Sequence, residues 1–107
     1  MIHVTYYRLF NRVTVEGHAG SGPEGHDLVC AAVSALALTL AGNVAHMQAQ
    51  DAVRDVITKL DEGNAEIQCT PHRRYKDSVE LIFRSICVGF ELLATKYPEN
   101  ISYEVRG

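Results

Sequence analysis

Alternating apolar and polar residues predict three strands near the two ends of the chain. The first covers residues 2 to about 8, the second covers residues 13–17 after a turn at Asn11-Arg12, and the last begins at Ile101. In each segment every second side chain is apolar, as expected where one face of a strand is buried. The first two are close enough in sequence to pair as a hairpin.

Residues 51–70 form a second region with strand character. The apolar spacing over residues 51–60 fits both a helix and a strand. We interpret its second half as a strand because Glu62-Gly63-Asn64 is a plausible turn and residues 65–70 alternate beyond it. A hairpin explains both pieces, and Pro71 then breaks the pattern.

Apolar residues spaced by three and four predict a long helix after a glycine-rich segment. Asp27 stands where the N-cap is expected. One ridge, expected to pack on a sheet, consists of Val29, Val33, Leu36, Leu40, Val44 and Met47. The neighbouring face carries the small residues Cys30, Ser34, Ala37 and Ala41. We expect these to let another backbone approach, for which a second subunit is one candidate.

A second amphipathic helix has its apolar residues between Val79 and Tyr97. Asp77 and Glu80 are spaced like a capping box, and Pro98 ends the helix. The resulting order ββαββαβ predicts an α+β fold, with a mostly antiparallel sheet packed against two helices. A chain of 107 residues, 47% of them hydrophobic, forms one core, so residues 1–107 are expected to be a single domain.

The net charge and the cysteine content limit the range of possible functions. A net charge of −3, with Arg73-Arg74 as the only basic pair, argues against direct nucleic-acid binding, which needs clustered Lys and Arg. Three cysteines at unrelated spacings make no disulfide framework, and no leader sequence opens the chain. We therefore expect reduced thiols and a cytoplasmic location.

An uncharged stretch, residues 28–45, is long enough to suggest a membrane span. It contains polar and small residues and is rich in alanine rather than leucine. His26 and His46 flank it instead of a basic or aromatic belt. We interpret it as a buried core helix and expect no membrane partner.

Reactive side chains gather between the second strand and the long helix: His18, His26, Asp27 and Cys30. A thiol in the first turn of a helix has a lowered pKa because the helix dipole favours the thiolate. A neighbouring histidine would complete a Cys-His pair for nucleophilic catalysis, with Asp27 either orienting the imidazole or capping the helix. Both histidines are candidates for the base.

Other interpretations of these residues stay open at this point. A cysteine in an apolar helix can be an ordinary core residue, and these side chains could also hold a metal, although their spacing is not that of familiar zinc motifs. The intervening residues have the composition of a movable flap rather than of packed core: Ala19, Gly20, Ser21, Gly22, Pro23, Glu24 and Gly25.

The segment GHAGSGPEGHDLVCAAVSAL, residues 17–36, resembles the signature of the ribosomal-processing cysteine proteases, a bacterial family. The shared pattern is Gly-His-Ala, a short loop, Gly-x-Asp-x-Val-Cys-Ala and a helix containing serine. The order of elements, the length and the Tyr97-Pro98-Glu99-Asn100-Ile101 segment extend the resemblance over the whole chain. It implies that His18 is the catalytic histidine, that Cys30 is the nucleophile, and that Asp27 and Ser34 support them.

The resemblance also implies a homodimer and a flexible loop over the site at about residues 19–25. We expect no cofactor and no metal. The implied substrate is a large-subunit ribosomal protein with a short N-terminal extension, which is removed after an aromatic residue. Two other functions remain as alternatives: a non-catalytic ribosome-assembly factor that binds the same ribosomal protein, and a metal-binding regulator.

Overall fold

The computed structural model of the chain describes residues 1–17 and 26–107, except for the side chains of His26 and Asp27. His18 and the loop predicted over residues 19–25 lie outside the described residues. The site can therefore be built from the elements on either side of this segment, which are β2 and α1.

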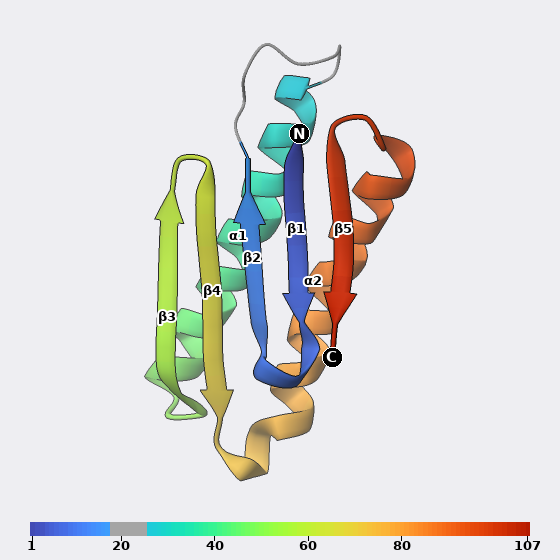
Figure 1. Cartoon of the computed structure of the whole chain (residues 1–107). Coiled ribbons are helices and arrows are strands. Elements are labelled where there is room, and N and C mark those ends of the chain that lie inside the picture. The colour runs from blue at the N-terminus through green and yellow to red at the C-terminus, as the bar shows by residue number, and fades with distance from the viewer. Residues whose placement is uncertain (18–25) are drawn as a thin grey trace.

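Five strands form one mixed sheet in the order β3-β4-β2-β1-β5 (Figure 1). The strands are β1 (Ile2–Tyr7), β2 (Arg12–Glu16), β3 (Val53–Asp61), β4 (Asn64–Pro71) and β5 (Ile101–Arg106). Strand β1 pairs with β5 in parallel, and the other three pairings are antiparallel. The predicted α+β fold with a mostly antiparallel sheet is confirmed.

Two long helices, α1 (His26–Ala49) and α2 (Lys76–Lys96), cover one face of the sheet (Figure 1). Short 3-10 turns, η1 (Arg8–Phe10) and η2 (Arg73–Tyr75), precede β2 and α2. The core lies between the two layers, and Leu40, Ile67 and Phe83 are fully buried in it. The other face of the sheet is polar and includes the ion pair between Arg12 Nε and Glu66 Oε2, at 2.7 Å.

Both predicted helix caps are wrong. Helix α1 begins at His26, so Asp27 lies in its first turn rather than at the N-cap. Helix α2 begins at Lys76, and Asp77 also lies in the first turn. There η2 leads directly into the helix, and the Lys76 N–H donates to the carbonyl of Arg73. The backbone supplies the partner that a capping carboxylate would otherwise provide, while an acidic residue in the first turn still interacts favourably with the helix dipole.

Strand β3 is longer than the sequence predicts, because it begins at Val53, opposite Pro71. Its pairing with β4 shifts register between Arg54 and Ile57, and Asp55 has a left-handed φ of 52°. Such a bulge interrupts the alternation of side chains on the two faces. This interruption explains why the first half of the segment resembles a helix in its apolar spacing.

The predicted ridge of α1 is largely confirmed, since five of its six residues are buried: Val29, Val33, Leu40, Val44 and Met47. Leu36 is only partly buried and lies toward α2, where a Cβ added to Gly89 would come within 2.8 Å of its side chain. On the neighbouring face Ala37 and Ala41 are buried within the chain itself. The backbone that approaches this face belongs to the chain, so these two alanines do not form a surface for a second subunit.

Residues 28–49 of α1 are long and apolar enough to cross a membrane. The most apolar 18-residue window of this stretch has a mean hydropathy of 2.0, and 33% of that window is buried inside the fold. The core helix of a globular domain meets the same criteria of length and composition. In this chain α1 packs along the sheet, and Val29, Leu40 and Val44 have no exposed surface. The expectation of no membrane partner stays a prediction.

Buried thiols make the stability of the fold sensitive to alkaline pH. Burial raises the pKa of Cys69 to about 11 and that of Cys87 to about 12, and it also raises the pKa of Tyr103, which shares a hydrogen bond with Cys87. In the unfolded chain thiols titrate near their ordinary pKa of about 8.5. Above that pH the unfolded chain releases protons that the folded chain keeps, so the free energy of unfolding falls as pH rises.

We expect the free energy of unfolding to decrease between pH 9 and 11 by up to about 1.4 kcal/mol per pH unit for each buried thiol. Urea unfolding monitored by circular dichroism at a series of pH values measures this decrease. Cys69→Ala should be less stable at pH 7 but should lose stability less steeply above pH 9. Equal alkaline slopes for the variant and the natural sequence would contradict this assignment.

Candidate active site

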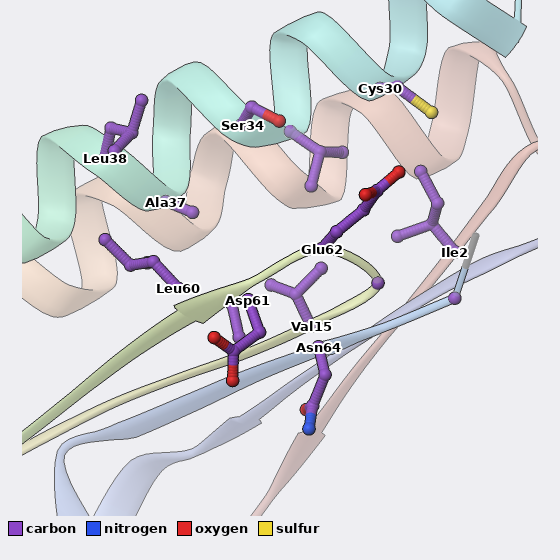
Figure 2. Close-up of a pocket in the computed structure, with 14 residues that line it drawn as sticks. Ile2, Val15, Cys30, Ser34, Ala37, Leu38, Leu60, Asp61, Glu62 and Asn64 are labelled. Carbon is purple, nitrogen blue, oxygen red and sulfur yellow. The ribbon is translucent and has the colours of Figure 1, made fainter. Parts of the chain in front are cut away.

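A pocket of about 330 Å³ lies between the N-terminal half of α1 and the hairpin that joins β3 to β4 (Figure 2). Cys30, Ser34 and Ala37 line it from α1, and Leu60, Glu62 and Gly63 line it from the hairpin. The ends of β1 and β2 complete it with Ile2, Val15 and Gly17. Its lining is mostly apolar and also includes a thiol, a hydroxyl and the acidic residues Asp61 and Glu62.

Cys30 is half-buried and lines this pocket, whereas Cys69 and Cys87 are buried in the core, as predicted. It is the fifth residue of α1, because the helix begins earlier than the sequence predicts. The helix dipole acts mainly within the first turn, so its effect on this thiol is weaker than a first-turn position would give. Cys30 is thus the thiol placed to meet a ligand in the pocket.

Ser34 lies one helical turn after Cys30 and lines the same pocket. Residues four apart on a helix share a face, and Figure 2 shows the Ser34 side chain on the pocket side of α1. The structure therefore brings together two of the four residues predicted for the site. It does not test the other two, because His18 and the side chain of Asp27 lie outside the described parts of the chain.

Gly17 brings the end of β2 to the pocket. Its N–H donates to the carbonyl of Gly63 at 3.0 Å, which joins β2 to the hairpin turn. Its φ is +128°, and a Cβ built there would overlap the Met1 carbonyl and come within 2.9 Å of the Ile2 Cα. Only glycine fits this conformation and this close approach. His18 follows Gly17 directly in the sequence.

The tip of the β3–β4 hairpin is a part of the site that the sequence analysis identified only as a turn. Asp61, Glu62 and Asn64 all line the pocket. They reach it because β4 pairs with β2 in the register Glu16↔Asn64, which places the turn beside the end of β2. No local pattern specifies that register, so the sequence offers no direct sign of this contribution.

Comparisons with known proteins identify the family. The family model described as cysteine protease Prp matches residues 1–102. The chain belongs to this family. It is accordingly a cysteine protease, and its family is associated with ribosomal processing.

Relatives of known name agree with this assignment. The ribosomal processing cysteine protease Prp of Staphylococcus aureus, from two strains, is 30% identical over 89 residues, which are 83% of this chain and 80% of the relative. The resemblance noted from residues 17–36 is therefore confirmed at the level of the family.

Solved structures share the fold along nearly the whole chain. The crystal structure of SMU.848 from Streptococcus mutans has a TM-score of 0.68 and 28% identity, and the match covers 97% of this chain and 90% of that one. Prp from S. aureus in complex with a substrate peptide has a TM-score of 0.70 and 25% identity, covering 98% and 97%. The same enzyme with a covalently linked product peptide has a TM-score of 0.65 and 27% identity, with the same coverage.

Proposed function

We propose that this chain is an endopeptidase that removes the short N-terminal extension of a large-subunit ribosomal protein, with Cys30 as nucleophile and His18 as base. The main support is that Cys30, and neither of the two buried thiols, lines the pocket of a chain that belongs to a cysteine protease family. A Prp relative with a covalently linked product peptide is consistent with a nucleophilic mechanism.

In the proposed reaction the Cys30 thiolate attacks the carbonyl carbon of the scissile bond and forms a thioester. His18, as imidazolium, donates a proton to the departing amine as the C–N bond breaks. Water then adds to the thioester with its proton taken up by His18, and the carboxylic acid leaves as the C–S bond breaks. The position of Gly17 at the pocket supports this role for the residue that follows it.

The apolar wall of the pocket supports cleavage after an aromatic residue. Val33, Leu38 and Leu60 lie along it, and the volume of about 330 Å³ is enough for one large side chain. A residue held there would place the adjoining carbonyl near Cys30, whose sulfur lies at one end of the pocket in Figure 2. In this proposal Ser34 contributes a hydrogen bond within the pocket, and Asp27 orients the imidazole of His18.

We also propose that the protein works in the cytoplasm as a homodimer that uses the outer surface of the helical layer. Helix α1 has no Asp, Glu, Lys or Arg after Asp27, and its Leu28 is 61% exposed. On α2, Leu81, Val88 and Leu92 are also exposed, at spacings that place them on one stripe of the helix. Exposed apolar surface of this kind is typical of protein–protein interfaces.

We expect Cys30→Ala and His18→Ala each to reduce cleavage of an extended ribosomal-protein peptide by at least about a thousand-fold, because the two groups act as one unit. Mass spectrometry of the peptide measures the products. Cys69→Ala and His26→Ala serve as controls and should still cleave. Retained cleavage by Cys30→Ala or His18→Ala would refute the dyad.

We expect Val88→Glu to shift the protein toward a monomer, since a carboxylate in a buried apolar contact is costly. Light scattering coupled to size-exclusion chromatography measures the mass in solution. Glu91→Lys, on the same helix but beside the apolar stripe, is the matched control and should leave the mass unchanged. A mass that is monomeric for the natural sequence, or unaffected by Val88→Glu, would contradict this interface.

A further inference from the structure

Glu62 occupies the tip of the β3–β4 hairpin and faces the proposed nucleophile. The turn has two residues, Glu62 and Gly63, and is closed by the pairing of Asp61 with Asn64. Figure 2 shows the Glu62 side chain extending from the turn toward the part of α1 that carries Cys30, whereas the Asp61 carboxylate is directed away from it. Among the side chains that the structure describes, Glu62 is therefore the carboxylate directed toward the nucleophile.

The backbone fixes the position of this turn. Gly63 has a φ of +74°, which glycine adopts without strain, and its carbonyl accepts a hydrogen bond of 3.0 Å from the Gly17 N–H. Strand β4 also pairs with β2 next to the turn, at Asn64↔Glu16. These contacts hold the main chain of Glu62 at a set place relative to α1, so its carboxylate is confined to the region around the pocket opening.

No basic side chain balances this carboxylate among the described residues. The lining of the pocket contains Asp61 and Glu62 and no Lys or Arg. The four ion pairs within residues 1–17 and 26–107 all lie elsewhere, on strands β3 and β5, between Arg12 and Glu66, and between His72 and Asp51. A peptide bound in the pocket would therefore meet an apolar wall and, at the hairpin turn, a carboxylate that no Lys or Arg of the described lining neutralises.

We propose that Glu62 is a specificity residue that selects peptides carrying Lys or Arg close to the scissile bond. This inference rests on the proposed protease function and adds a second requirement to the large apolar residue of the substrate. The carboxylate would pair with the ammonium or guanidinium group at the opening while the neighbouring side chain fills the apolar part. An acidic residue at the same position of the peptide would be disfavoured by repulsion.

The test uses a set of peptides based on an uncharged reference with an aromatic residue before the scissile bond. Lys, and separately Glu, replaces one flanking position at a time. For the natural sequence we expect at least one position where Lys raises kcat/KM about three- to five-fold and Glu lowers it. An increase of this size is what one partly exposed ion pair contributes. The preference should shrink in high salt because exposed charges are screened.

Variants of Glu62 identify the residue responsible. Glu62→Gln should remove the difference between the Lys and Glu peptides, and Glu62→Lys should reverse it. Glu16→Gln removes the same charge near the same end of the sheet, on the polar face away from α1, and should keep the preference for Lys. Circular dichroism should show that each variant is folded, because Glu16 and Glu62 are both exposed.

The possible results separate this inference from the function on which it rests. If the natural sequence cleaves neither the uncharged reference nor any of its charged derivatives, the proposed protease substrate is wrong. If it cleaves the reference but shows no dependence on charge, the role of Glu62 is overturned. A preference for Lys that persists unchanged in Glu62→Gln would also overturn it.

Discussion

The hydrogen bond between Gly17 and Gly63 is the contact on which the arrangement of the site depends. It joins the end of β2, which leads toward His18, to the hairpin turn that forms one wall of the pocket. Two glycines are required here for different reasons. At Gly17 the backbone of Met1 and Ile2 leaves no room for a Cβ, and Gly63 adopts a positive φ at the turn. The opposite wall is α1, so the pocket exists only where these three segments meet.

Helix α1 serves both the core and the site because its small residues lie on the side of the pocket. Bulky residues such as Leu40 and Val44 pack fully on the sheet. Toward the hairpin, Cys30, Ser34 and Ala37 leave a space that larger side chains would fill. The same helix therefore stabilises the fold through one ridge and leaves the thiol accessible beside it. Its exposed surface is also apolar, which supports the proposed association of two chains.

The strands and helices could be predicted from the sequence wherever one face of an element is buried. Strand β1 alternates between buried and exposed residues along its length, and α2 buries Val79, Phe83, Cys87 and Phe90 along one side. The predictions failed where the structure depends on backbone conformation and backbone hydrogen bonds rather than on the pattern of side chains. The bulge near Asp55 obscured the start of β3, and the turn η2 took the place of a side-chain cap before α2.

Part of the site could be predicted in the same way, because Cys30 and Ser34 are neighbours on one helix. Glu62 could not, since its position depends on the pairing of β4 with β2, which are far apart in the sequence. The roles of His18 and Asp27 came from the resemblance to a family, and the family is now shown by the match over residues 1–102. The dyad itself remains a proposal supported by the position of Cys30.

Trapping the covalent intermediate tests that proposal most directly. The protein is mixed with an extended ribosomal-protein peptide, quenched in acid within the first turnover, digested and examined by mass spectrometry. Our account predicts a thioester between the amino-terminal product of the peptide and the Cys30 sulfur. An acyl group on Cys69 or Cys87, or cleavage with no acylated thiol at any time point, would contradict it.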